Sequence, residues 1–164
     1  MPSRSSLTIE QVLTLLAEAP PRIATLTSGL QPAQLHAAPS HGEWSANDML
    51  AHLRSCADVW GSCIEMILDQ DTPTIRAINP RTWIKKTDYP ELKFQPSLRA
   101  FATQRAKLLA VLEPLAPEDW LRAATVTGGG KPRKQTVHNY ARRLALHEQA
   151  HLKQIERIVN TMHM

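Results

Sequence analysis

Two histidines stand four residues apart in the segment His147-Glu148-Gln149-Ala150-His151, inside a long run of residues that favour helix. On a helix, this spacing places both imidazoles one turn apart on the same face. A third histidine, His52, lies on an apolar stripe of an upstream predicted helix. Neutral imidazole nitrogens are good ligands for divalent transition metals. Three histidines on buried faces, with no ion-pair partner in the pattern, therefore predict a shared metal ion.

The alternative for each histidine is an ordinary place in the core. A single histidine on an apolar face is more often a hydrogen-bonded core residue than a ligand, so His52 alone would carry little weight. The combination of an i, i+4 pair with a third histidine on a facing helix favours the metal site. Three protein ligands leave a coordination position open, which is typical of catalytic sites. Histidines without a carboxylate favour zinc or nickel over magnesium or calcium.

The same motif has the spelling His-Glu-x-x-His, which is also found in zinc proteases, where the glutamate is the general base. The extended motif of those enzymes would require a third histidine at the position of Arg157. We therefore keep Glu148 as a candidate catalytic base or partner of a metal ligand. A partly exposed acid on the helix surface is the alternative.

Several further residues could take part in the site or could have only a structural role. Cys56 lies one turn after His52 and is a candidate fourth ligand, although buried cysteines usually serve packing. Asp48 is a candidate to orient an imidazole. The alternative is that its carboxylate only caps the start of the helix. Tyr140 is either a pocket residue or part of the core. The glycine run at 128–130 is predicted to be a hinge or lid over the site.

Helical periodicity predicts the elements that position these residues. The predicted helices cover residues 8–30 (kinked or broken at Pro20 and Pro21), 45–71, 96–114 and 137–161, with short turns at 81–86 and 116–120. Capping boxes begin the first two helices at Thr8 and Ser45. The proline-rich segment 73–96 is a long crossover, and 125–134 is expected to be a flexible loop. No strand pattern competes, so the predicted fold class is all-α, a four-helix bundle.

Length and composition bound the class of protein. The chain has 164 residues and 43% hydrophobic residues, which suits one domain over 1–164. The net charge of +4 comes from scattered Lys and Arg, so nucleic acid is a weakly supported partner. Residues 1–19 lack the unbroken apolar core of a signal peptide, and no stretch is long enough for a transmembrane helix. Cys56 and Cys63 would lie roughly 10 Å apart on one helix, too far for a disulfide, which indicates a cytoplasmic protein.

Three segments together resemble the DinB/YfiT-like family of metalloenzymes. They are Trp44-Ser45 at a helix start, Leu50-Ala51-His52-Leu53, and His147-Glu148-x-x-His151-Leu152-x-x-Gln154-Ile155. The resemblance spans most of the chain. It implies a four-helix bundle with a long crossover after the second main helix, a divalent metal held by His52, His147 and His151, and a frequent homodimer. Relatives include transferases and isomerases that use a low-molecular-weight thiol.

Three classes of function follow from this reading. The leading one is a metal-dependent enzyme acting on a small molecule, either a thiol-dependent transferase or a metal-dependent hydrolase, and the resemblance slightly favours thiol transfer. The second is a metal-containing stress or binding module without turnover. The third is a DNA-associated helical protein, which only the basic pI of about 9.3 suggests.

Overall fold

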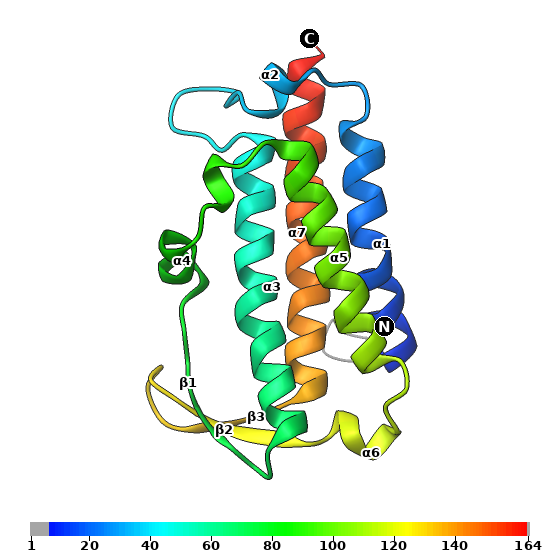
Figure 1. The fold of residues 1–164 in the computed structure, drawn as a ribbon, viewed down its shortest axis with the longest axis vertical. Coiled ribbons are helices and arrows are strands. Elements are labelled where there is room, and N and C mark those ends of the chain that lie inside the picture. The colour runs from blue at the N-terminus through cyan, green and yellow to red at the C-terminus, as the bar shows by residue number, and fades with distance from the viewer. Residues whose placement is uncertain (1–6, 164) are drawn as a thin grey trace.

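The computed structural model describes residues 7–163 and shows four long helices packed side by side (Figure 1). They are α1 (Ile9–Thr27), α3 (Ala46–Asp69), α5 (Phe94–Leu112) and α7 (Val137–Met162). This arrangement confirms the predicted four-helix bundle. The first six residues and the last residue of the predicted domain lie outside the described part of the chain. Within that part, no helix is both long and apolar enough to cross a membrane.

Short elements occupy the connections between the long helices. They are α2 (Pro32–Leu35), α4 (Pro80–Trp83), α6 (Pro117–Trp120) and two 3-10 turns, η2 (Ile84–Lys86) and η3 (Tyr89–Glu91). The turns predicted at 81–86 and 116–120 are therefore confirmed. The connection from α3 to α5 is the expected long crossover and runs along the outside of α3 (Figure 1).

Capping boxes begin three of the long helices. The boxes predicted at Thr8 and Ser45 are confirmed, and a third pairs Thr136 with Asn139 at the start of α7. Each box satisfies backbone N–H groups that the first helical turn leaves without a partner. The start of α7, and with it the register of the two histidines that follow, is thereby defined.

The predicted break at Pro20 and Pro21 is wrong, because α1 continues through both prolines to Thr27. The alternative, a kink at the two prolines, stays a prediction. A proline lacks the N–H that would bond to the carbonyl four residues earlier, so Pro20 leaves the Leu16 carbonyl without its helical donor. The Arg105 side chain on α5 takes that place and donates from Nη1 to the Leu16 oxygen over 2.9 Å. Tertiary structure thus compensates for a local helix-breaking signal.

The segment 125–134 was predicted to be a flexible loop. It belongs to a β-hairpin, so this prediction is wrong. β2 (Ala123–Thr127) pairs antiparallel with β3 (Arg133–Thr136), and β1 (Thr74–Arg76) adds a parallel edge. Gly128 and Gly130, with φ of 90° and 100°, supply the left-handed backbone that the hairpin turn needs. The sheet lies at the end of the bundle where α7 begins (Figure 1), so this hairpin offers no support for a lid over the histidines.

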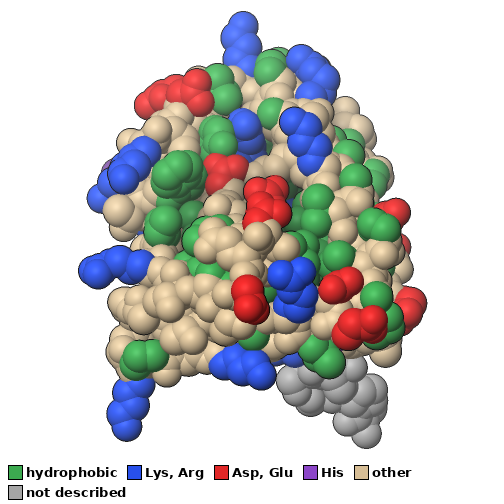
Figure 2. Space-filling view, turned by 60° about the horizontal axis from the view of Figure 1, so that its bottom comes forward, with side chains coloured by type: hydrophobic (Ala, Val, Ile, Leu, Met, Phe, Trp, Pro, Cys, Tyr) green, Lys and Arg blue, Asp and Glu red, His purple; other side chains and the backbone are tan. Residues whose placement is uncertain are grey.

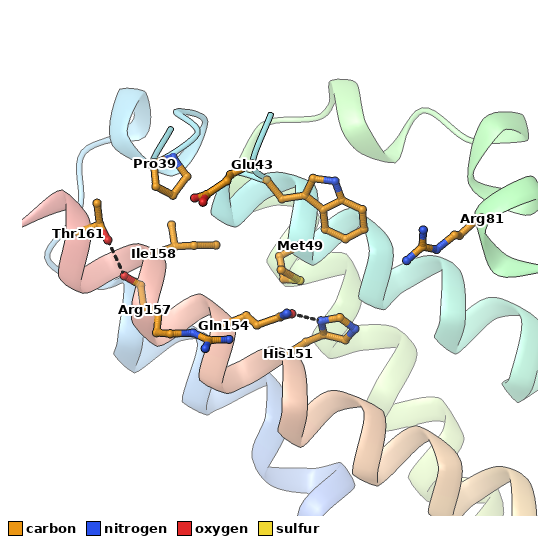
Figure 3. Close-up of a pocket in the computed structure, with 10 residues that line it drawn as sticks. Pro39, Glu43, Met49, Arg81, His151, Gln154, Arg157, Ile158 and Thr161 are labelled. Atoms are coloured by element: carbon orange, nitrogen blue, oxygen red, sulfur yellow. Dashed lines mark hydrogen bonds between the residues drawn. The ribbon is translucent and has the colours of Figure 1, made fainter. Parts of the chain in front are cut away.

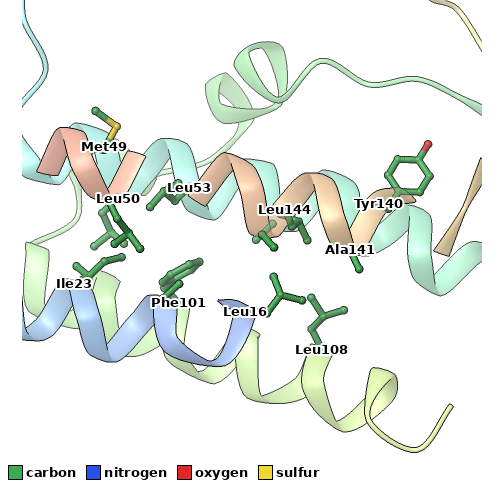
Figure 4. Packing of buried hydrophobic residues seen from close by; sticks show 14 of the residues in the cluster. Leu16, Ile23, Met49, Leu50, Leu53, Phe101, Leu108, Tyr140, Ala141 and Leu144 are labelled. Carbon is green, nitrogen blue, oxygen red and sulfur yellow. The ribbon is translucent and has the colours of Figure 1, made fainter. Parts of the chain in front are cut away.

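The core fills the space between the four long helices. Fully buried side chains from all of them meet there (Figure 4), including Leu16, Ile23, Leu53, Phe101 and Leu144. Burial of each such side chain contributes about 1.5–3 kcal/mol. The core therefore holds α3 and α7, the two helices that carry the histidines, in a defined register.

The crossover is fastened to α3 by the carboxylate of Asp58. It accepts hydrogen bonds from Trp83 Nε1 (3.0 Å), the Tyr89 hydroxyl (2.6 Å) and, on α5, Gln104 Nε2 (2.6 Å). Charge-assisted bonds of this kind are among the stronger side-chain interactions. The short helix α4 is therefore anchored beside α3.

The basic residues of the chain do not gather on the face drawn in Figure 2. Lys and Arg side chains there are interspersed with Asp, Glu and hydrophobic side chains. A surface that follows a phosphate backbone needs a continuous basic stripe. This face of the molecule does not offer one.

Candidate metal centre

The structure brings together the three histidines that the sequence predicted as ligands. His52 lies on α3 and His147 and His151 on α7, the two helices with the most extensive packing in the bundle. His147 Nε2 is 3.1 Å from His52 Nε2 and 3.0 Å from His151 Nε2. The ligand atoms of all three lie within 4.8 Å of one another. Three ring nitrogens from distant segments thus converge on one point.

These separations suit a metal ion with three nitrogen ligands. Bonds of about 2.05 Å in a tetrahedral site place neighbouring nitrogens about 3.3 Å apart. Without an ion or a proton between them, three unprotonated ring nitrogens would direct lone pairs at the same volume. The donor set is chemically right for a transition metal ion such as zinc or nickel.

The surroundings of the three imidazoles keep them neutral. Burial lowers the pKa of His147 to about 3, and the nearby charges of His151 and His52 add to this effect. Burial, followed by His151 and Arg81, lowers the pKa of His52 to about 4. The pKa of His151 is also lowered, mainly by burial. At neutral pH, all three rings therefore have an unprotonated nitrogen available for a metal.

Gln154 orients His151. The His151 Nδ1–H donates to the side-chain oxygen of Gln154, one turn further along α7. The proton is then on Nδ1, and Nε2, which faces the other histidines, carries the lone pair. Gln154 belongs to the motif quoted from the sequence, but sequence reasoning assigned it no role. Its i+3 spacing from His151 was the available signal.

Replacing Gln154 by leucine is expected to lower metal affinity about 10- to 100-fold, because the ring loses the partner that sets its orientation. Competition with a chromophoric chelator, using zinc and nickel in turn, measures the change. Gln154→Glu keeps an oxygen acceptor at the same distance along the side chain and serves as the matched control. Equal affinities for the leucine variant and the unmodified protein would contradict the orienting role.

Cys56 lies against two of the histidines. Its Sγ is 3.7 Å from His52 Nε2 and 3.8 Å from His147 Nε2. Burial, helped by the charge of Glu148, raises the pKa of this thiol to about 12. The side chain is therefore a protonated thiol in the metal-free protein, and its role as a fourth ligand stays a prediction.

Two other residues that the sequence offered for the site, Asp48 and Tyr140, have structural roles. Asp48 accepts the backbone N–H of Ser45 within the capping box, in line with the cap duty that the sequence offered as its alternative. Tyr140 is buried in the hydrophobic core. Both cysteines are free and buried.

Glu148 binds an arginine and not one of the histidines. Its two carboxylate oxygens bind Nη1 and Nη2 of Arg105 on α5, and both side chains are almost fully buried. The alternative interpretation of Glu148, as a partly exposed acid on the helix surface, is therefore wrong. A general base has to reach the proton that it removes, directly or through one water. The catalytic role predicted for Glu148 finds no support in this arrangement.

A pocket of about 570 Å³ opens beside His151 (Figure 3). Its wall is formed by Pro39, Glu43, Trp44, Met49, Arg81, His151, Gln154, Arg157, Ile158 and Thr161. The Trp44 ring also packs against His52, with ring centroids 5.2 Å apart. A small molecule in this pocket would therefore lie against His151, whose Nε2 is 3.0 Å from His147 Nε2. Sequence reasoning used Trp44 only as part of the family motif and missed Arg81.

Comparisons with known proteins agree with this description. The family model described as "DinB superfamily" matches residues 15–155. A protein of Geobacillus kaustophilus (strain HTA426) named "Putative metal-dependent hydrolase GK0616" is 24% identical over 153 residues, which cover 90% of this chain and 82% of the relative. YfiT from Bacillus subtilis, described as "a probable metal-dependent hydrolase with an unusual four-helix bundle topology", matches with a TM-score of 0.81 and 18% identity. That match covers 99% of this chain and 93% of YfiT, and it concerns the fold.

Proposed function

The chain belongs to the DinB superfamily, and from this premise we propose that it is a metal-dependent hydrolase acting on a small molecule. The observation that carries the proposal is the convergence of three Nε2 atoms, from His52, His147 and His151, beside a pocket of suitable size. Pockets that bind small molecules commonly have volumes of about 300–1,000 Å³.

The three histidines would hold a divalent ion, which we propose to be zinc or nickel. Such an ion with an open coordination position lowers the pKa of a bound water and polarises a carbonyl group. The residues of this chain prepare the site for that chemistry. Burial keeps the rings unprotonated, and Gln154 directs the lone pair of His151. Trp44 and Met49 line the pocket with apolar surface, which excludes water around a bound molecule.

Hydrolysis is preferred here over the thiol transfer that the sequence resemblance slightly favoured. One similar protein is named a "Putative metal-dependent hydrolase" and the other is described as "a probable metal-dependent hydrolase", which supports hydrolysis as the leading reaction. A low-molecular-weight thiol as cosubstrate, and a metal-containing binding module without turnover, are the competing proposals. The homodimer that the resemblance implies stays a prediction.

The experiment is a turnover screen with controlled metal content. Purified protein is stripped with a chelator, reloaded with zinc or nickel, and incubated with small amides and esters, with and without cysteine as a simple thiol. We expect hydrolysis that needs the metal, is lost on chelation, returns on reloading and does not need the thiol. Substrate consumption only in the presence of the thiol would replace hydrolysis by thiol transfer. Tight metal binding without turnover on the panel would favour the binding module.

A further inference from the structure

We propose that the pocket beside the three histidines takes a small molecule with one carboxylate group, and that Arg81 binds this carboxylate. The inference rests on the proposed function and adds the substrate class. Arg81 and His151 line the same pocket, and Figure 3 shows the Arg81 guanidinium directed into it. A ligand in contact with the histidine cluster is therefore within the space that Arg81 borders.

Within the described part of the chain, the guanidinium of Arg81 has no hydrogen-bond or ion-pair partner. Among residues 7–163, no hydrogen bond or ion pair of this side chain is present, and only its backbone N–H is bonded, to Asn79 Oδ1 over 2.9 Å. Its charge lies beside the site, since Arg81 and His151 line the same pocket. A divalent ion held there would be a second positive charge close to Arg81. An anion between the two would turn this repulsion into attraction.

The planar shape of the guanidinium and the anchored backbone of α4 favour a carboxylate as the ligand of Arg81. Arginine presents a planar set of N–H donors that matches two carboxylate oxygens. The backbone of α4 is held by its Asn79 cap and by the bond from Trp83 to Asp58, so the arginine is presented from an anchored element. Because the backbone is already anchored, only the arginine side chain has to be ordered when a ligand binds.

Apart from a bound ion, the charged side chains of the pocket suit a ligand with one negative charge. Arg157 and Glu43 also line it, so the three charged side chains together carry a net charge of +1. Trp44, Met49 and Ile158 form an apolar wall that suits an aromatic or aliphatic body. The substrate class is therefore a small amphipathic carboxylic acid that carries the bond to be hydrolysed.

The test compares benzoate with benzamide, which has nearly the same shape but no charge. Isothermal titration calorimetry is run on metal-free and on zinc-loaded protein, for the unmodified chain, Arg81→Gln and Arg99→Gln. Arg99 is exposed on α5 and does not line this pocket, so its variant controls for the loss of one positive charge. A hydrogen-bonded charge pair corresponds to about tenfold or more in affinity. We expect benzoate to bind at least tenfold more tightly than benzamide, and this preference to disappear only in Arg81→Gln.

Three results would overturn the inference. They are equal affinities for benzoate and benzamide, an unchanged preference for benzoate in Arg81→Gln, and tighter binding of inorganic phosphate than of benzoate. The metal-free arm separates this inference from the proposed function. If the protein binds no metal but prefers benzoate through Arg81, the hydrolase proposal fails and the carboxylate site stands. If metal and turnover are found without the preference, only the carboxylate site fails.

Discussion

The His147→Ala variant is expected to lose stoichiometric zinc or nickel, with an affinity about a hundredfold to a thousandfold below that of the unmodified protein. His147 Nε2 lies within 3.1 Å of both other ligand atoms and is the common neighbour of the set. Binding of a structural zinc ion stabilises a protein by about 10–16 kcal/mol, shared over four ligands, so one ligand contributes about 2.5–4 kcal/mol. Metal analysis by mass spectrometry after dialysis, with chelator competition for affinity, measures the loss.

The matched control is His41→Ala, which removes an exposed histidine in the loop between α2 and α3. We expect this variant to bind metal like the unmodified protein. Thermal unfolding of both variants without metal shows whether the bundle is intact. If His147→Ala keeps full stoichiometry and affinity, the three rings pack together without holding an ion, and the hydrolase proposal loses its basis.

The histidine cluster could be predicted because its signals are local. The i, i+4 spacing of His147 and His151 defines one face of α7, and the apolar stripe around His52 defines the facing side of α3. Burial of both stripes brings the rings together once the helices pack. The main helices were predicted to within a few residues for the same reason.

The β-hairpin and the course of the crossover could not be predicted in this way. The strand Ala123–Thr127 has five residues, and its pairing with Thr74–Arg76 joins residues 51 positions apart, such as Thr74 and Thr125. Periodicity in one short segment carries no information about such a partner. Arg81 was missed as a pocket residue for a related reason, because its position depends on how the crossover is anchored at Asp58.

The ion pair between Arg105 and Glu148 also escaped prediction, although one signal was available. Arg105 stands four residues after Phe101 and three before Leu108, on the buried stripe of α5. A charged residue at such a position requires a buried partner. The partner lies 43 residues away on α7, and the same guanidinium serves the Leu16 carbonyl that Pro20 leaves without a donor.

Replacing Glu148 by alanine is therefore expected to lower the free energy of unfolding by about 3–5 kcal/mol, because Arg105 would remain buried with an uncompensated charge. Both side chains are at most 2% exposed, so water cannot take the place of the carboxylate without local rearrangement. Equilibrium unfolding in urea of the metal-free protein measures the change and separates it from any effect of a bound ion.

A double variant, Arg105→Met with Glu148→Leu, tests whether that loss comes from the unpaired charge. Apolar side chains of similar volume often replace a buried ion pair at little cost, so most of the stability should return. The Leu16 carbonyl would again lack a donor, which leaves a deficit of about 1–3 kcal/mol. We expect metal affinity in the double variant to match that of the unmodified protein, since neither side chain bonds to the histidines. If the double variant has restored stability and full metal content but no turnover, this result would support the catalytic role that the sequence predicted for Glu148.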